Sequence, residues 1–319
     1  MSLRIVYMGT PDFAVAGLQA IHESEHEIVG VVTVADKPSG RGQKVRMSPV
    51  KTYAESQGLK VLQPLKLRDE GFLEELQALQ ADLFVVVAFR MLPEVVWQMP
   101  PLGTINLHGS LLPNYRGAAP IHWAVINGDK ETGVSTFFIQ KEIDTGAVLL
   151  REAIQIGANE TTGSLHDRMM KLGAETIVQT LRMIESGEYE AIDQDELIKN
   201  EGQSHAPKLF KENTQINWSK TAQEVHNFVR GLNPFPSAWT TDGEKHFKIH
   251  LGRPTAAPSI NSKPGKLRVQ EGSIQIACSD YWFQVDEIQL EGKKRMPSRD
   301  LINGLQEDQR RTFEAIAFE

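Results

Sequence analysis

Residues 104–120 read TINLHGSLLPNYRGAAP, a stretch that mixes polar, strained and apolar residues as an ordinary core segment does not. Its first four residues alternate as a short strand does, which predicts that the side chains of Asn106 and His108 lie on one face. The chain then turns, crosses Pro113 and reaches Pro120, which is expected to open a helix. An amide and an imidazole held side by side at the end of a buried strand offer two hydrogen-bonding groups to one ligand atom. The stretch therefore indicates a site for carbonyl chemistry.

The neighbouring segments predict an α/β fold with a doubly wound, Rossmann-like sheet. Residues 3–8 form a short apolar strand that is followed by a glycine turn and an amphipathic helix, and residues 83–89 form an apolar strand of the kind buried in a parallel sheet. Such sheets bind ligands at the carboxyl ends of their strands. The glycine turn lacks the second and third glycines of the dinucleotide fingerprint, so a simple turn is favoured over dinucleotide binding.

Length and composition are those of a globular protein with room for two domains. Of the 319 residues 40% are hydrophobic and 24% are charged, and the net charge is -7. The longest apolar run, residues 83–89, is far shorter than a membrane span, and Arg4 interrupts the first apolar segment. We therefore expect no signal peptide, no membrane contact and a cytoplasmic location. Cys278 is the only cysteine, which excludes an intrachain disulfide and predicts a small buried hydrophobe.

Residues 22–26 read HESEH and match a zinc-protease motif in spacing only. That motif needs one continuous helix to aim both rings at a metal, whereas a β-branched strand is expected directly after His26. An exposed connection is favoured over a zinc site, and we expect no metal.

The pattern changes near residue 188, which predicts two domains. Residues 1–188 are expected to form the catalytic domain, which ends in a long helix. Residues 189–209 are polar and poor in pattern and are expected to form a linker. Residues 210–319 contain a helix followed by short alternating segments separated by glycine and proline, a spacing typical of a small closed β-barrel.

Two basic segments suit a polyanionic partner such as RNA. Their cations are Lys37, Arg41, Lys44, Arg46, Lys293 and Lys294. The first four lie within residues 35–49, and a structureless loop of this length is uncommon without a function. The last two lie in the second half of the chain, where basic residues exceed acidic ones. A solvated surface is the alternative for both segments.

Asp144 is the third polar residue expected at the site. It follows the predicted strand of residues 134–139 in a tight turn, where an aspartate often only completes the turn. That strand is expected to return Asp144 to the same sheet edge as His108. Attack of an amine on a formyl carbonyl creates an oxyanion, to which Asn106 and a protonated His108 would donate hydrogen bonds. Asp144 would hold the imidazolium and help to move the proton between the two nitrogens.

A serine hydrolase built from Ser110, His108 and Asp144 is an alternative on composition. The residues after Ser110 read LLP, so the glycine that a nucleophile elbow requires two residues after the serine is missing. A histidine satisfied within the core is the alternative for His108 alone. The neighbours of His108 favour formyl transfer over both.

At these residues the chain resembles the 10-formyltetrahydrofolate-dependent formyltransferases. The motifs that carry the resemblance are NLHGSLLP (106–113), RGAAP (116–120), DTG (144–146), GTPDF (9–13), GRG (40–42), SPVK (48–51) and NPFP (233–236). The last four are similar to the branch of the family that formylates methionyl-tRNA, and the resemblance covers essentially the whole chain. One departure is FRM at 89–91, where relatives commonly carry Tyr-Gly and one further residue before a Leu-Pro pair.

The resemblance implies transfer of a formyl group from 10-formyltetrahydrofolate to the amino group of initiator methionyl-tRNA, which leaves tetrahydrofolate and serves bacterial-type translation initiation. It implies that Asn106, His108 and Asp144 are catalytic and that the loop around Arg41 enters the acceptor stem. The folate-binding residues expected are Ser110, Leu111, Leu112, Pro113, Phe89, Arg90 and Leu92. The C-terminal barrel would resemble an OB fold and help to hold the tRNA, and we expect a monomer.

Three other functions fit parts of the pattern. An enzyme that formylates an amino sugar on a nucleotide would share the catalytic half, but the basic segments favour tRNA. A formyltetrahydrofolate hydrolase would use water in place of the amine and release formate. A non-catalytic RNA-binding protein on an enzyme scaffold would not need His108.

Overall fold

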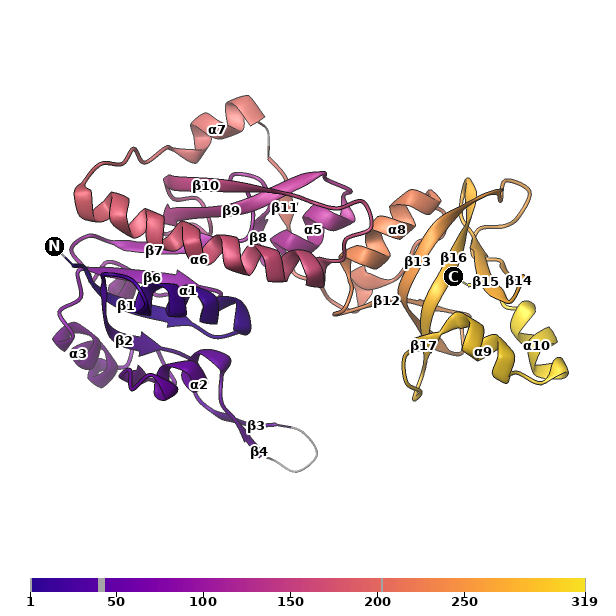
Figure 1. The fold of residues 1–319 in the computed structure, drawn as a ribbon, viewed down its shortest axis with the longest axis horizontal. Coiled ribbons are helices and arrows are strands. Elements are labelled where there is room, and N and C mark those ends of the chain that lie inside the picture. Colours follow the sequence, from indigo (N-terminus) through magenta and orange to yellow (C-terminus); the bar gives the residue numbers. More distant parts are fainter. Residues whose placement is uncertain (1, 40–43, 202, 319) are drawn as a thin grey trace. The chain divides into compact units, whose positions relative to one another are not determined.

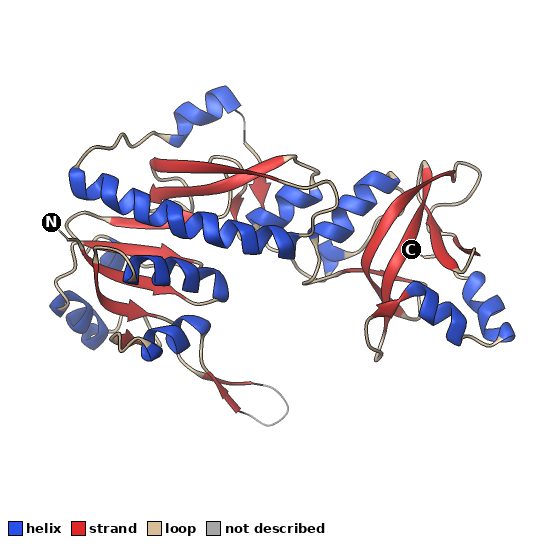
Figure 2. Cartoon of the chain, in the orientation of Figure 1, coloured by secondary structure: helices blue, strands red, loops and turns tan. Residues whose placement is uncertain are grey.

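The computed structural model describes residues 2–39, 44–201 and 203–318, and these form two compact units (Figure 1). The first unit comprises Met1–Pro120, Thr132–Ile154 and His166–His205. The second comprises Ile121–Glu131, Gln155–Leu165 and Ala206–Glu319. Each unit contains one large sheet, drawn in red in Figure 2. Among the described residues, no helix combines the length and the apolar character that crossing a membrane requires.

A seven-stranded sheet with strand order β10-β9-β7-β6-β1-β2-β5 forms the centre of the first unit. Its strands are β1 (Arg4–Gly9), β2 (Glu27–Val32), β5 (Val61–Leu62), β6 (Leu83–Val87), β7 (Thr104–His108), β9 (Glu131–Phe138) and β10 (Val148–Gln155). The five strands from β5 to β7 in this order pair in parallel, whereas β9 pairs antiparallel to β7. β6 reads LFVVV and is buried over its whole length, as expected for a strand covered on both faces.

Helices cover both faces of this sheet, so the expected α/β architecture is confirmed. On one face the fully buried Tyr7 donates its hydroxyl to the carbonyl of Ala14 at 2.6 Å, and burial raises the pKa of this phenol far above its usual range. Figure 1 shows α1 (Asp12–His22) and α6 (Thr162–Ser186) across this face. On the other face, apolar side chains of α3 (Glu70–Ala78) pack against alternate residues of β1 and β6.

The helix predicted at Pro120 is present, and another helix follows Ser48. Four further helices of the chain are α2 (Pro49–Ser56), α4 (Glu94–Trp97), α5 (Pro120–Ile126) and α7 (Gln194–Glu201), and β8 (Arg116–Gly117) precedes α5. The Ser48 hydroxyl accepts a hydrogen bond from the Lys51 amide, which satisfies one of the unpaired donors at the start of α2. Proline at the first position presets the backbone of α2 and α5 for a helix.

The basic segment of residues 35–49 contains a hairpin where the sequence predicted a structureless loop. β3 (Lys37–Ser39) pairs antiparallel with β4 (Lys44–Arg46). Residues 40–43, and with them Arg41, lie outside the described residues. The hairpin therefore replaces part of the expected loop with paired backbone.

The stretch of residues 189–209, expected to be a linker, contains α7 and the short strand β11 (His205–Ala206). Leu197 of α7 packs against a buried cluster in the first unit, formed by Leu112, Phe137 and Val148. Leu197 and Ile198 are the only large apolar residues of α7, so no helical period marks it in the sequence.

The second unit contains an antiparallel sheet with strand order β12-β13-β16-β15-β14, to which β17 adds by pairing with β16. Its strands are β12 (Ala238–Thr241), β13 (His246–Pro258), β14 (Leu267–Gln270), β15 (Ser273–Ala277), β16 (Tyr281–Leu290) and β17 (Met296–Pro297). β12 and β14 lie at opposite edges, and within the part of the chain that the structure describes they do not pair with each other. The closure expected of a small barrel is thus not found.

One apolar core joins this sheet to its helices. These are α8 (Ala222–Gly231), α9 (Ser298–Gly304), α10 (Glu307–Glu314) and a single 3-10 turn (Glu212–Thr214). Thr221 and Glu224 form a capping box at the start of α8, and Val225 and Val229 of this helix lie in the core. Cys278 is 1% exposed in the same core, which confirms that it is a buried hydrophobe.

Candidate active site

His108 at the end of β7 faces Asp144, which lies in the loop after β9. His108 Nδ1 and Asp144 Oδ2 are 3.8 Å apart, and both side chains are largely buried. Asn106 projects from the same face of β7 as His108 and is the one residue of this strand that is not fully buried. The structure thus brings together the two members of the expected trio that are distant in sequence. The third, Asn106, lies two residues before His108 and is partly exposed.

Asp144 reaches His108 by a route that differs from the expected one. The sequence predicted a return to the same sheet edge, but β9 runs antiparallel to β7, so Phe138 at its end pairs with Ile105. The loop after β9 therefore starts beside the first half of β7, and it must turn back to bring Asp144 to His108. Asp144 adopts the left-handed region with φ 55°, and its Oδ2 accepts a hydrogen bond from the amide of Gly117 at 3.0 Å.

Both ring nitrogens of His108 face an acceptor. Nε2 lies 2.8 Å from the carbonyl oxygen of Tyr115, and because a carbonyl only accepts, this nitrogen carries a hydrogen. Nδ1 faces the carboxylate of Asp144. Tyr115 has φ 59°, and its N–H donates to the carbonyl of Ser204 at 2.7 Å. The surroundings therefore offer a partner to each N–H of an imidazolium.

The segment after β7 is built into the interior. Within residues 110–113, three residues are buried: Ser110, Leu112 and Pro113. The Ser110 hydroxyl donates to the carbonyl of Asn114 at 2.5 Å, so it is not aimed at His108 as a serine nucleophile would be. Leu111 is half-buried, which leaves it as the most accessible side chain among residues 110–113.

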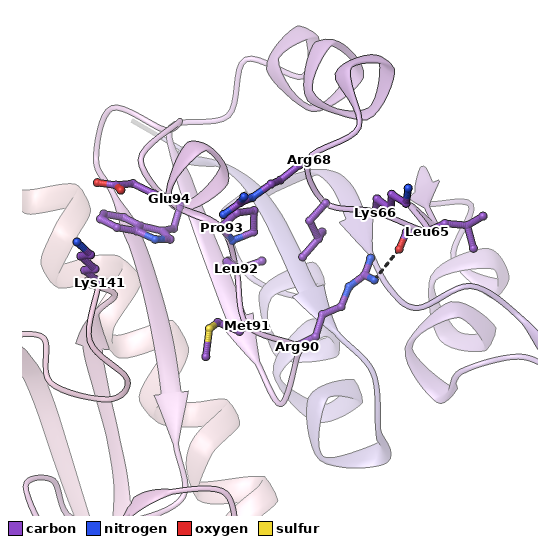
Figure 3. A pocket seen from close by; sticks show the side chains of 11 residues that line it. Leu65, Lys66, Arg68, Arg90, Met91, Leu92, Pro93, Glu94 and Lys141 are labelled. Atoms are coloured by element: carbon purple, nitrogen blue, oxygen red, sulfur yellow. Dashed lines mark hydrogen bonds between the residues drawn. The ribbon is translucent and has the colours of Figure 1, made fainter.

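A cavity of about 430 Å³ lies in the first unit, where Arg90, Leu92 and Trp97 contribute to its wall. Figure 3 shows Arg90 and Met91 on the segment after β6, with Lys141 and Leu65 at opposite sides of the lining. Lys141 belongs to the same loop as Asp144, so one loop contributes both to the cavity and to the His108–Asp144 pair. Of the expected folate-binding residues, Arg90 and Leu92 line this cavity.

Arg90 is held by backbone carbonyls and an aromatic ring. Its Nη1 donates to Leu65 O at 3.1 Å and its Nη2 to Pro64 O at 2.5 Å. The guanidinium carbon lies 5.7 Å from the centre of the Phe89 ring, so Phe89 contacts Arg90 and is not itself among the cavity-lining residues. Within the described residues, Nε of Arg90 is buried and has no hydrogen-bond partner. A buried donor of this kind suits an acceptor supplied by a ligand.

The cations expected to contact RNA lie in both units. Those of the β3–β4 hairpin in the first unit are Lys37, Lys44 and Arg46, of which Arg46 is exposed. Lys293 and Lys294 are exposed in the turn after β16 of the second unit. Arg41 lies outside the described residues.

Glu25, His26 and Glu185 place potential metal-ligand atoms within 4.8 Å of one another. Nδ1 of His26 accepts a hydrogen bond from the Leu3 amide at 3.4 Å, so Nε2 carries the hydrogen and offers no lone pair. Arg182 donates to both carboxylate oxygens of Glu25 and lowers the pKa of Glu25 to about 2. The protein's own donors occupy this cluster, which does not suit a metal ion.

The residues that fix Asp144 and Tyr115 were missed in the sequence. The Gly117 amide donates to the Asp144 carboxylate, and the Ser204 carbonyl accepts from the Tyr115 amide. The Gln194 side chain donates to the Asp144 carbonyl, although the two residues are 50 positions apart in the sequence. Gln194 and Ser204 lie in the stretch expected to be a linker. No local pattern marks a residue whose role depends on contact with a distant loop.

Two family profiles match most of the chain. The profile described as formyl transferase matches residues 3–181, and that of the formyl transferase C-terminal domain matches residues 208–306. A methionyl-tRNA formyltransferase of Flavobacterium johnsoniae is 49% identical over 306 residues, which cover 95% of this chain and 96% of the relative. A protein of the same name from Parabacteroides distasonis is 48% identical over 312 residues, which cover 96% of each chain.

Solved structures share the fold at lower identity. An N-formyltransferase of Helicobacter canadensis, in complex with folinic acid and dTDP-3-aminofucose, has a TM-score of 0.66 at 22% identity and covers 89% of this chain and 99% of that one. HypX of Aquifex aeolicus, in complex with tetrahydrofolic acid, has a TM-score of 0.63 at 17% identity. That match covers 95% of this chain but 47% of HypX. At these identities the likeness concerns the fold alone.

Proposed function

The chain belongs to the formyl transferase family, and we propose that it transfers the formyl group of 10-formyltetrahydrofolate to the amino group of methionyl initiator tRNA. The observation that carries this proposal is the 49% identity to a methionyl-tRNA formyltransferase over nearly the whole of both chains. The products are tetrahydrofolate and N-formylmethionyl-tRNA, which serves bacterial-type translation initiation. In this proposal the protein works as a monomer in the cytoplasm, where its tRNA acceptor is found.

Asn106, His108 and Asp144 carry the chemistry in this proposal. The methionyl amine attacks the formyl carbon, and the formyl oxygen bears a negative charge until the bond to N10 of the folate breaks. The amide of Asn106 donates a hydrogen bond to this oxygen, and a charged His108 ring stabilises it electrostatically. Asp144 stabilises the charged ring and helps to move the amine proton to the leaving nitrogen. Because Nε2 of His108 is directed at Tyr115, a direct hydrogen bond from this nitrogen to the substrate requires that the Tyr115 carbonyl be displaced.

The cavity beside Arg90 is the proposed site of the formyl donor. Folates combine a flat heteroaromatic ring with a tail that ends in carboxylates. Leu92 and Trp97 suit the ring, and three basic side chains of the wall suit the carboxylates: Lys66, Arg68 and Arg90. The unpartnered Nε of Arg90 is the strongest single sign of a missing anionic or polar partner. The other folate-binding residues of the proposal are Phe89, Ser110, Leu111, Leu112 and Pro113.

The tRNA contacts of the proposal involve both halves of the chain. Residues 1–188 form the catalytic domain, residues 189–209 connect it, and residues 210–319 form a tRNA-binding domain whose antiparallel sheet is an open relative of the OB-like barrel. The cations that contact tRNA phosphates are Lys37, Arg41, Lys44, Arg46, Lys293 and Lys294. Contacts of this kind weaken steeply as the salt concentration rises.

The test is incubation of the protein with 10-formyltetrahydrofolate and charged initiator tRNA, followed by mass spectrometry for N-formylmethionine. We expect formyl transfer by the unaltered protein and a loss of about 100-fold to 1000-fold in kcat for His108→Ala, since removal of one preorganised group at an oxyanion has effects of this size. Formate release without an acceptor would identify a hydrolase instead. Formylation of an amino-sugar nucleotide but not of tRNA would identify a sugar formyltransferase, and tRNA binding without turnover would identify a binding protein.

Arg41→Ala separates the tRNA role of the basic segment of residues 35–49 from the chemistry. We expect this variant to lose activity on methionyl-tRNA far more than it loses folate binding, because it lacks a phosphate contact. Lys171→Ala is the control, since it removes one exposed cation from α6 of the first unit. Equal activity of the two variants on tRNA would refute the role of the basic segment of residues 35–49.

A further inference from the structure

Gln194, the first residue of α7, ties together the two loops that surround His108. Its Nε2 donates to the carbonyls of Asp144 at 3.0 Å and Gly146 at 2.7 Å. Its Oε1 accepts a hydrogen bond from Nε of Arg116 at 2.9 Å. One carboxamide thereby fixes both the loop that carries Asp144 and the loop that leads to Gly117, whose amide binds the Asp144 carboxylate.

The orientation of this carboxamide follows from its partners. The carbonyls of Asp144 and Gly146 can only accept, and the guanidinium of Arg116 can only donate. The NH2 group must therefore face the carbonyls and the oxygen must face Arg116. Gln194 has no exposed surface, so these partners replace the water that the amide would otherwise bind. Replacing the amide by an apolar group would leave two carbonyls and one guanidinium nitrogen without this partner.

Gln194 is itself fixed by the sheet. Two residues before it, Ile192 exchanges backbone hydrogen bonds with Val148 at the start of β10, at 2.8 and 2.9 Å. Three residues after it, Leu197 packs on Leu112, Phe137 and Val148. Phe137 pairs with Asn106 across β7 and β9, and residues opposite each other in an antiparallel pair project from the same face. The residue that anchors α7 thus packs on the same face of the sheet as Asn106.

Asp144 needs such an anchor because its backbone is not part of a strand. It lies in the left-handed region, and the loop must turn back after β9 to reach His108. Its side chain is held by the Gly117 amide and its carbonyl by Gln194. We propose that Gln194 is a positioning residue, which acts on catalysis by holding the Asp144 carboxylate against His108. This inference rests on the proposed formyl transfer and adds a residue to its machinery.

The test compares Gln194→Met and Gln194→Glu with the unaltered protein in the formyl-transfer assay. Methionine keeps the length of the side chain without any hydrogen bond, and glutamate keeps the acceptor for Arg116 but presents oxygen to the two carbonyls. Both variants are expected to lose about 10-fold to 100-fold in kcat, since a misplacement near 1 Å has effects of this size. KM for the folate and for the tRNA is expected to change less than about twofold, because Gln194 touches neither substrate.

Thr180→Val is the matched control for lost stability. Thr180 is fully buried in the first unit, and its hydroxyl bonds Thr136 and the carbonyl of Thr176 without touching either loop of the site. We expect this variant to unfold at a lower temperature and to keep its kcat. An equal loss of kcat in Thr180→Val would show that reduced stability alone explains the effect, and it would overturn the inference.

A second pair of variants tests whether Gln194 acts through Asp144. In an Asp144→Asn background, followed in single turnovers with protein in excess, Gln194→Glu is expected to lower the rate less than about twofold. A loss as large as in the unaltered background would overturn the inference, as would full kcat in Gln194→Met. Absence of formyl transfer by the unaltered protein would instead refute the proposed function, so the two failures are distinguishable.

Discussion

Replacing Gly146 by alanine tests whether the path of the Asp144 loop sets the rate. A Cβ on Gly146 would stand 1.7 Å from the carbonyl oxygen of Phe138, and real Cβ atoms essentially never approach another heavy atom closer than 3.0 Å. The two backbones must therefore separate by more than an ångström. Phe138 is the last residue of β9 and is held by its pairing with β7, so we expect the loop to move.

The size of the effect follows from how near Gly146 lies to the proposed catalytic residue Asp144. Asp144 lies two residues before Gly146, and Gln194 holds the carbonyls of both, so a shift at one is transmitted to the other. A misplacement of about 1 Å at a reacting group can lower the rate about 100-fold, and we expect kcat to fall by about this factor. Crowding of this kind also lowers the free energy of unfolding, typically by about 1 to 3 kcal/mol.

The assay is formyl transfer to initiator methionyl-tRNA, with thermal unfolding measured on the same samples. Gly71→Ala is the control, because a Cβ at this position in α3 meets only the Asp69 side chain at an ordinary 3.4 Å. Alanine is the better helix former, so Gly71→Ala is expected to keep its kcat and to unfold at the same or a higher temperature. A folded Gly146→Ala protein with the kcat of the unaltered chain would refute the reasoning.

Three further predictions concern other parts of the chain. Asp36 accepts hydrogen bonds from Lys51 and Gln63 at the base of the β3–β4 hairpin. The hydrogen bond from Lys51 lowers the pKa of Asp36, so the Asp36→Asn variant should unfold at a lower temperature than the unaltered protein near pH 7. The stability that the charged Asp36 contributes is fully present above the pKa of about 3.9 that Asp36 has in the unfolded chain. It is lost as the pH falls through the lower pKa of Asp36 in the folded protein. The unfolding temperatures of the unaltered protein and of Asp36→Asn should therefore differ equally at pH 7 and pH 5, and a difference that disappeared at pH 5 would contradict the pairing. Burial raises the pKa of Cys278 to about 12, so a thiol reagent at pH 8 should label it only after denaturation, and rapid labelling of the folded protein would contradict its burial. Arg90→Met should raise KM for the folate about tenfold with little change in kcat, because a group that binds the ground state and the transition state equally affects only KM. An unchanged KM would count against the cavity as the binding site of the formyl donor.

The predicted parts of the fold are the elements whose apolar pattern in the sequence matches their burial in the folded protein. The apolar run at residues 83–89 became β6 (Leu83–Val87), and the alternation of residues 104–107 became β7 with Asn106 and His108 on one face. In the second unit the helix expected before the short alternating segments is α8, and the segments are the strands from β12 to β17. Each of these elements is stabilised by burial of apolar residues, and such burial requires a periodic pattern of apolar residues that can be recognised in the sequence.

The parts that were not predicted depend on contacts between distant segments. The antiparallel direction of β9 was missed, because an alternating segment pairs in either direction and the choice is made by its neighbours. α7 was missed, because it is held to the first unit by Leu197 and by a single buried carboxamide and lacks an apolar stripe. The barrel was expected to close, but strand spacing alone does not specify whether β12 and β14 meet.

The backbone strain beside His108 explains why the stretch that carries α7 matters for the candidate site. Tyr115 and Asp144, which present the two acceptors that face the ring, are both non-glycine residues in the left-handed region. Such a conformation costs about 1 to 3 kcal/mol for each residue and persists only where the surroundings fix it. The fixing contacts are the bond from the Tyr115 amide to Ser204 and the bond from Gln194 to Asp144. Both come from the stretch that carries α7, so without this stretch the two loops would relax and His108 would lose both partners.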